Sequence, residues 1–184
     1  MRRRNPGNQA QMYGVSLIEL LVTLFVAVLM LGLAVPAYHD WVAGSELMNE
    51  ARHLASSMTR ARAEAINSGF RANLCPTAGG RQCAPTGTWE RGWILFIDSN
   101  GDGLVNAGER VLWTEEAAAP GITMAANAPL NHYVSYTSLG HARLRSGALQ
   151  MGTFTVCRRG RLAVDVVLAH SGRVRIAKTK AVCP

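Results

Sequence analysis

Apolar and polar positions divide the chain into a long helical first part and a β-rich remainder. The residues from Leu17 to Tyr38 are apolar or uncharged apart from Glu19, and a run of this length can cross a membrane as a helix. After Pro36 apolar residues recur at steps of three and four, which predicts a helix with one buried stripe. The stripe comprises Leu47, Ala51, Leu54, Met58, Ala61 and Ala65. We therefore predict one helix from Val15 to about Ser68, ended by Gly69.

Beyond this helix, short runs rich in β-branched and aromatic residues alternate with turn residues, which is typical of antiparallel strands. The predicted strands are Arg71–Leu74, Gly92–Ile97, Arg110–Trp113, Tyr133–Tyr136, Gly152–Cys157, Leu162–Leu168 and Gly172–Ala177. We expect loops from Pro76 to Gly92 and from Glu115 to Pro129. The predicted fold class is α+β, a long N-terminal helix packed on an antiparallel sheet. The length left after the membrane-length segment suits one compact domain.

Charge is distributed unevenly along the chain of 184 residues, whose formal net charge is +7. The first 14 residues carry Arg2, Arg3 and Arg4 and no acid. From Val15 to Gly140 there are seven Lys/Arg against eleven Asp/Glu, a net of −4. From His141 to Pro184 there are nine Lys/Arg against one acid, Asp165, a net of +8. This basic last quarter predicts a partner that is a polyanion, whereas a solvated basic face or pairing with acidic neighbours is the alternative.

The start of the apolar run carries a specific signal. A carboxylate such as Glu19 costs roughly 2.5–3.5 kcal/mol in a membrane-spanning helix, so its presence indicates a purpose. The segment Gly14-Val15-Ser16-Leu17-Ile18-Glu19 resembles the cleavage and assembly motif of type IV prepilins and type II secretion pseudopilins. The resemblance implies cleavage after Gly14 by a prepilin peptidase, methylation of Val15, and contact of Glu19 with a neighbouring subunit of the filament. Pro36 matches the family's helix-kinking proline, whereas Val15 replaces the usual Phe or Met.

This resemblance divides the chain into a leader of residues 1–14, a transmembrane and filament-core helix of residues 15–38, and a periplasmic head of residues 39–184. The basic leader favours a cytoplasmic start, which places the head outside the inner membrane. The alternatives are an anchor that is never cleaved and a signal-peptidase cut near Ala34.

Four cysteines fit an oxidising compartment and allow three pairings. We favour Cys75–Cys83, which closes a short loop, and Cys157–Cys183, which fastens the C-terminus. Free buried thiols are the alternative.

One motif matches the template of a calcium loop. Its oxygen donors would be Asp98, Asn100, Asp102 and Glu109, with Gly103 at the sharp turn. However, strands rather than helices are predicted on both sides, and the same residue types build tight turns. The stretch also resembles the hairpin of GspH and FimT-like heads. A structural turn is therefore the favoured interpretation, and calcium is the alternative.

The C-terminal quarter holds the sharper signal, Gly172-Arg173-Val174-Arg175. Two arginines two positions apart on a strand leave the same face, and guanidinium groups can bind phosphate oxygens bidentately. Val174 and Ile176 would then face the core. The sequence resembles the DNA-binding motif of FimT-type minor pilins, which implies contacts to the DNA backbone without sequence preference. The candidate DNA contacts are Arg173, Arg175, Arg158, Arg159, Arg161, Lys178, Lys180, Arg143 and Arg145.

The sequence thus predicts a minor type IV pilin of the GspH/FimT/FimU family that binds double-stranded DNA for uptake. The alternative is a structural minor pilin, or an H-type pseudopilin, that primes assembly of the filament. The expected partners are other pilins, prepilin peptidase, the inner membrane and DNA. We expect no cofactor and no enzymatic activity, because the histidines show no metal-ligand spacing and His170 beside Ser171 does not make a catalytic arrangement.

Overall fold

The computed structural model describes residues 16–77, 79–85 and 87–184. The predicted cleavage after Gly14 and methylation of Val15 lie outside these residues. The chain divides into two compact units, Met1–Val42 and Ala43–Pro184, and each is described by itself.

A single helix, α1 (Leu17–Ser68), contributes to both units. It runs without interruption past Pro36 and ends before Gly69, which has a positive φ of 74° and donates its N–H to the carbonyl of Ala65. The apolar part of α1 is long and apolar enough to cross a membrane. The predicted helix and its glycine stop are confirmed.

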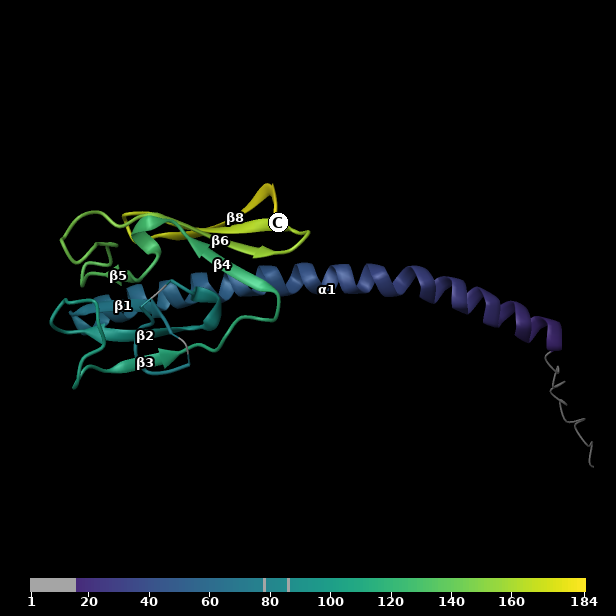
Figure 1. Cartoon of the computed structure of the whole chain (residues 1–184), viewed down its shortest axis with the longest axis horizontal. Helices are drawn as coiled ribbons and strands as arrows, with labels where there is room; N and C mark the ends of the chain where they lie inside the picture. Colours follow the sequence, from purple (N-terminus) through teal and green to yellow (C-terminus); the bar gives the residue numbers. More distant parts are fainter. Residues whose placement is uncertain (1–15, 78, 86) are drawn as a thin grey trace, which may run out of the picture. The chain divides into compact units, whose positions relative to one another are not determined.

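The head contains two antiparallel sheets of four strands each (Figure 1). The first has the order β3-β2-β1-β5 and comprises β1 (Arg71–Pro76), β2 (Trp93–Asp98), β3 (Val111–Thr114) and β5 (Val134–Tyr136). The second has the order β4-β6-β7-β8 and comprises β4 (Ile122–Ala126), β6 (Gly152–Arg158), β7 (Leu162–Leu168) and β8 (Val174–Val182). Two short 3₁₀ helices, η1 (Trp89–Arg91) and η2 (Ala128–Leu130), interrupt the loops. The α+β class is confirmed, with two sheets where one was expected.

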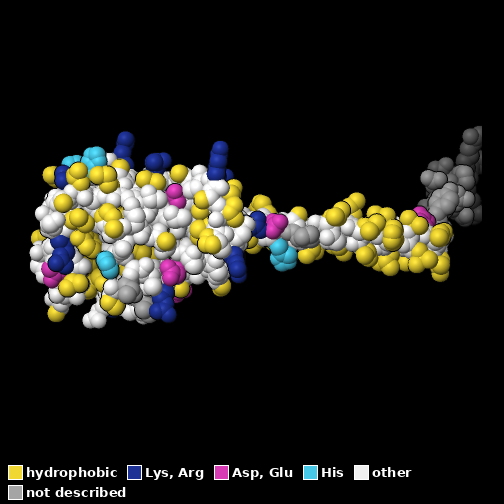
Figure 2. Space-filling view, turned by 45° about the horizontal axis from the view of Figure 1, so that its top comes forward, with side chains coloured by type: hydrophobic (Ala, Val, Ile, Leu, Met, Phe, Trp, Pro, Cys, Tyr) yellow, Lys and Arg dark blue, Asp and Glu magenta, His cyan; other side chains and the backbone are white. Residues whose placement is uncertain are grey.

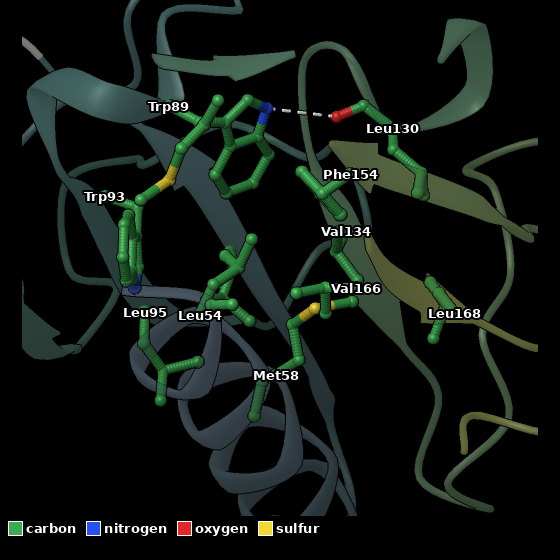
Figure 3. Packing of buried hydrophobic residues seen from close by; sticks show 14 of the residues in the cluster. Leu54, Met58, Trp89, Trp93, Leu95, Leu130, Val134, Phe154, Val166 and Leu168 are labelled. Carbon is green, nitrogen blue, oxygen red and sulfur yellow. Dashed lines mark hydrogen bonds between the residues drawn. The ribbon is translucent and has the colours of Figure 1, made fainter. Parts of the chain in front are cut away.

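The hydrophobic core lies between α1 and both sheets (Figure 3). All six residues of the predicted stripe are buried in it, and the close-up shows Leu54 and Met58 pointing from the helix toward the strands. Trp89 packs edge-to-face on Phe154 of β6, with ring centroids 5.0 Å apart, and its indole N–H donates to the carbonyl of Leu130 at 3.1 Å. Because the stripe completes this core, the second half of α1 is part of the head.

Seven of the eight strands lie where the pattern predicts them, and two predictions need correction. The predicted loop Glu115–Pro129 contains β4, whose alanines and methionine have weak β-propensity but whose Ile122 and Met124 alternate inward. The last strand does not end at Ala177: β8 continues to Val182, so Lys178 and Lys180 lie in a strand and not in a tail. Alternating lysines are typical of an edge strand, where charge discourages pairing with another chain.

In the structure Cys75 is bonded to Cys83 and Cys157 to Cys183, the pairing that the sequence favours. The second bond joins the end of β6 to the residue after β8 and so fastens the edge strand at its far end.

Candidate nucleic-acid interface

The turn between β7 and β8 presents the Gly-Arg-x-Arg segment. The N–H of Ala169 donates to the carbonyl of Arg173 at 2.9 Å, and the N–H of Gly172 donates back to the carbonyl of Ala169 at 2.8 Å. Gly172 has a φ of 80°, and a Cβ added to it would lie 2.0 Å from the carbonyl oxygen of Gly140. Only glycine can therefore occupy this position, because the turn packs directly on the backbone of the neighbouring loop. Sequence reasoning did not identify Gly140, which has a φ of 73° and forms the other side of this contact.

Arg173 and Arg175 are both exposed at this turn, while Val174 between them packs against the core. The strand begins at Val174 and not at the predicted Gly172, so Arg175 lies in β8 and Arg173 immediately before it. Ile176 is opposite the buried Val166 and therefore faces inward, but it remains 36% exposed because β8 is at the edge of the sheet. The expectation that it faces a closed core is therefore only partly correct.

The outward side of the sheet also carries one acid close to the arginines. Arg175 is opposite Val167 and Ala177 is opposite Asp165, so Asp165 is the diagonal neighbour of Arg175. Its carboxylate accepts a hydrogen bond from the hydroxyl of Thr155 at 3.0 Å. This acid was not among the predicted site residues. The negative charge of Asp165 lowers the positive electrostatic potential near Arg175, although the two side chains form no ion pair among the described residues.

A second group of basic residues lies at the opposite end of β8. Arg159 and Arg161 flank Gly160, whose N–H donates to the carbonyl of Cys183, and the N–H of Cys183 donates to the carbonyl of Arg161. Lys180 lies near the end of β8, three residues before Cys183 of the Cys157–Cys183 bond. Arg159 and Lys180 are exposed, and Lys178 is exposed between the two ends of the strand. Figure 2 shows the Lys and Arg side chains standing out singly over the head rather than as one continuous patch. Five of the nine predicted basic residues therefore fall into two groups at opposite ends of β8: Arg173 and Arg175 at its start, and Arg159, Arg161 and Lys180 near its end.

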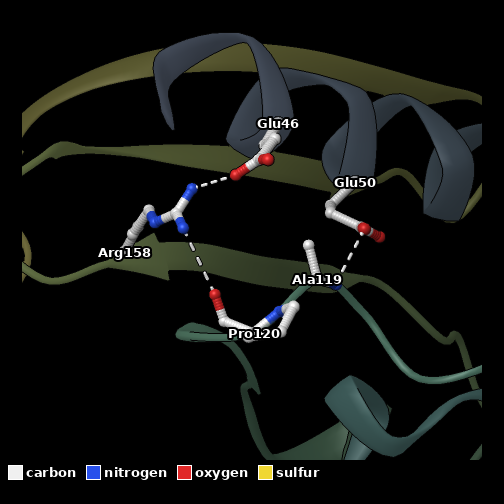
Figure 4. Close-up of polar contacts among 5 residues, drawn as sticks. All are labelled: Glu46, Glu50, Ala119, Pro120 and Arg158. Carbon is white, nitrogen blue, oxygen red and sulfur yellow. Dashed lines mark hydrogen bonds and ion pairs between the residues drawn. The ribbon is translucent and has the colours of Figure 1, made fainter. Parts of the chain in front are cut away.

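Arg158 has a different environment from its neighbours. Its guanidinium forms an ion pair with Glu46 of α1 and also donates to the carbonyl of Pro120 (Figure 4). One turn further along the helix, Glu50 accepts the N–H of Ala119 at 3.1 Å. These contacts fasten the segment before β4 to the helix, which gives Arg158 a structural task.

Arg143 and Arg145 follow Ala142, whose N–H donates to the carbonyl of His170 in the β7–β8 turn at 3.2 Å. They belong to a small hairpin in which Arg143 bridges to Leu149, and the carbonyl of Arg143 accepts from Arg71. Arg145 lies over Gly103 of the Asp98 loop. The pKa of Asp102 in this loop is lowered mainly by hydrogen bonds from the backbone of Leu104 and the side chain of Asn106, and the positive charge of Arg145 lowers it further.

The candidate calcium loop uses its oxygens internally. Asp98 is buried and accepts backbone N–H groups from Gly101, Asp102 and Gly103, at 2.7, 3.2 and 2.9 Å, and the side-chain amide of Asn73 at 2.6 Å. Glu109 accepts the N–H groups of Ser99 and Asn106. Within residues 16–77, 79–85 and 87–184 no cluster of three or more His, Cys, Asp or Glu residues could hold a metal ion. The geometry is that of a hydrogen-bonded turn.

Glu19 lies in the first turn of α1, where its side chain is exposed and its N–H donates to the hydroxyl of Ser16 at 3.3 Å. In this position the carboxylate is available to another molecule.

Comparison with known proteins agrees with this architecture. The family described as "Type II transport protein GspH" matches residues 50–172. The minor pilin FimU of Pseudomonas aeruginosa superposes with a TM-score of 0.59 at 16% identity, covering 77% of this chain and 98% of that one. The minor pseudopilin EpsH of the type 2 secretion system of Vibrio cholerae gives a TM-score of 0.50 at 13% identity, covering 74% and 99%. No curated protein sequence matches the chain. Because the family match spans about two thirds of the chain and the fold agrees, the protein belongs to the GspH family of minor pilins and pseudopilins.

Proposed function

We propose that this minor pilin binds extracellular DNA through its β7–β8 turn, with Arg173 and Arg175 as the principal contacts. The observation that carries the proposal is that both guanidinium groups are exposed on one side of a turn whose backbone is fixed by Gly172 and Gly140. A fixed backbone holds the two arginines at a constant spacing, guanidinium groups can bind phosphate oxygens bidentately, and phosphate contacts carry no sequence information. The expected ligand is therefore double-stranded DNA of any sequence, bound for uptake during natural transformation.

The other basic residues are weaker candidates for direct contact with DNA. Arg158 is already paired with Glu46, and Arg145 lies beside Asp102. Lys178 and Lys180 lie further along β8, and Arg159 and Arg161 lie in the turn between β6 and β7. These four residues add to the long-range attraction of a polyanion.

The test is DNA binding by the head, residues 43–184, which is a compact unit with its own core. We expect retardation of duplexes of unrelated sequence at low salt, and affinity that falls steeply as salt rises. The paired variant Arg173→Ala and Arg175→Ala should bind at least tenfold more weakly, equally for each sequence. Arg91→Ala and Arg110→Ala, which remove the same charge elsewhere, are the matched control. Unchanged binding by the first pair would refute the proposed site.

The assembly part of the proposal concerns the N-terminus. We propose that a prepilin peptidase cleaves after Gly14 and methylates Val15, that the apolar part of α1 holds the subunit in the inner membrane with its head in the periplasm, and that Glu19 contacts a neighbouring pilin. The support is the sequence motif together with an exposed Glu19 on a membrane-length helix. Mass spectrometry of the mature chain should give an N-methylated Val15, and a start near residue 35 would overturn this processing.

A purely structural minor pilin, or an H-type pseudopilin that primes a filament, is the second candidate. It is favoured by one observation: the GspH match ends at residue 172, immediately before the arginine pair, so family membership carries no information about that pair. The two candidates separate in the same experiment. A head that retards no DNA at low salt would leave the structural role.

A further inference from the structure

The end of the second sheet farthest from the β7–β8 turn presents cations beside apolar side chains. Leu162 and Val182 are opposite each other in the β7–β8 register, and they are 55% and 64% exposed. Arg159 and Lys180 are exposed beside them. We name this surface the base of the head, made of Arg159, Arg161, Leu162, Lys180 and Val182.

The base is held together by covalent and backbone bonds. The Cys157–Cys183 disulfide joins its two edges. The N–H of Gly160 donates to the carbonyl of Cys183 at 3.2 Å, and the N–H of Cys183 donates to the carbonyl of Arg161 at 2.8 Å. The turn between β6 and β7 and the end of the chain are therefore joined, so the backbone under these cations needs little further ordering to bind a ligand.

The base also lies beside the point where the chain enters the head. Arg158, the residue before Arg159, is paired with Glu46, which follows Trp41 by five residues. Tyr38 at the end of the apolar run and Trp41 after it are exposed, and aromatic residues in this position are typical of the boundary between lipid and water. Only five residues of chain, which span at most about 18 Å, separate Trp41 from Glu46, so the membrane-length segment tethers the head closely.

From this combination we infer that the base of the head binds the anionic phospholipid surface of the membrane that holds the apolar segment. Arg159 and Lys180 attract phosphate headgroups, while Leu162 and Val182 enter the interfacial layer. Binding would hold the head against the membrane before assembly and would leave the β7–β8 turn, at the other end of the strand, facing away. The inference rests on the proposed membrane anchoring and is independent of DNA binding.

The test measures sedimentation of the head, residues 43–184, with lipid vesicles. At low salt we expect it to sediment with vesicles that contain about one-third phosphatidylglycerol and to stay in solution with pure phosphatidylcholine, because each cation near an anionic surface contributes about fivefold in affinity. The paired variant Arg159→Glu and Lys180→Glu should lower vesicle binding at least tenfold. Arg173→Glu and Arg175→Glu, with the same change of charge, should keep vesicle binding and lose DNA binding.

Three results would overturn the inference. The first is equal binding to both kinds of vesicle, and the second is undiminished vesicle binding by the variant Arg159→Glu and Lys180→Glu. The third is a loss of DNA binding in that variant as large as in the variant Arg173→Glu and Arg175→Glu, which would make the base part of a nucleic-acid surface. Melting temperatures of both variants show whether they are folded. Hydrogen exchange of the full chain in nanodiscs gives a second reading: protection near residues 159–162 and 180–183 should increase with phosphatidylglycerol, and equal protection in both lipids would contradict the inference.

If the head binds vesicles and no DNA, the membrane contact stands and the proposed function fails. If the head binds DNA and no vesicles, the proposed function stands and the membrane contact fails.

Discussion

Two loops of this protein carry motifs that suggest a ligand, and the structure uses them in opposite ways. In the Asp98 loop the carboxylate of Asp98 already accepts hydrogen bonds from three backbone N–H groups and from the side-chain amide of Asn73. In the β7–β8 turn the backbone satisfies itself, and the side chains of Arg173 and Arg175 remain exposed. A polar motif can bind a ligand only with groups that the fold has not already used. By that criterion the basic turn keeps side chains that a ligand can reach, whereas the acidic loop is a structural element.

The largest expected effect belongs to the acidic loop. Replacing Asp98 with Ala leaves the N–H groups of Gly101 and Gly103 and the side-chain amide of Asn73 without their acceptor. The N–H of Asp102 keeps a second acceptor, the side-chain oxygen of Asn100 at 3.0 Å. The three lost bonds should lower the free energy of unfolding by about 3–5 kcal/mol. Urea denaturation of the head would measure the loss. Asp98→Asn keeps one acceptor oxygen and should cost less. A loss below about 1 kcal/mol for Asp98→Ala would mean that the loop is not held by this carboxylate.

The next effect separates the backbone of the basic turn from its side chains. Gly172→Ala should cost about 2–4 kcal/mol, because its Cβ would meet the carbonyl of Gly140 in a strained backbone conformation. Gly160→Ala is the matched control: its φ of 73° is similar, but its Cβ would have nothing within 4 Å, so it should cost only about 1–2 kcal/mol. Equal losses, measured by thermal unfolding, would show that the close approach to Gly140 contributes little.

Removing the arginines themselves should barely affect stability. The paired variant Arg173→Ala and Arg175→Ala should change the free energy of unfolding by no more than about 0.5 kcal/mol, because both side chains are exposed. The same denaturation experiment measures it. A loss above about 2 kcal/mol would show that these arginines stabilise the fold, so the basic turn would not differ from the Asp98 loop in this respect.

The smallest expected effect is that of calcium. Since the acidic side chains of the Asp98 loop already accept N–H donors, the melting temperature of the head should be the same with excess calcium and with EDTA. An increase of several degrees with calcium, absent in Asp102→Asn, would restore the loop as a metal site.

The success of the sequence predictions followed the strength of the periodic pattern. The stripe from Leu47 to Ala65 was predicted residue by residue, because steps of three and four are unambiguous over five turns. The strand β4 was missed, since Ala125 and Ala126 carry no β signal and the strand depends on pairing with β6. Its position is set by tertiary contacts that propensity does not describe.

The sequence predicted which residue types make up the candidate site, but not how they are arranged in space. Exposure of the arginine pair followed from strand alternation, because a period of two is local. The division of the basic residues into two groups and the pairing of Arg158 with Glu46 could not be predicted, because each joins segments distant in the sequence. Gly140 carried a signal only as a turn residue, and its close approach to Gly172 depends on how two loops pack.

The helix α1 has a mechanical consequence, because the element that can lie in the membrane also supplies the buried stripe of the head. Force applied to the apolar segment enters the head at Leu47 and acts along the helix axis. The buried contacts from Leu47 to Ala65 then bear the load together, in shear, and are not peeled apart one by one. A subunit pulled from the membrane by its helix would therefore take its folded head with it, and pulling the helix out of the head would require the core to rupture as a whole.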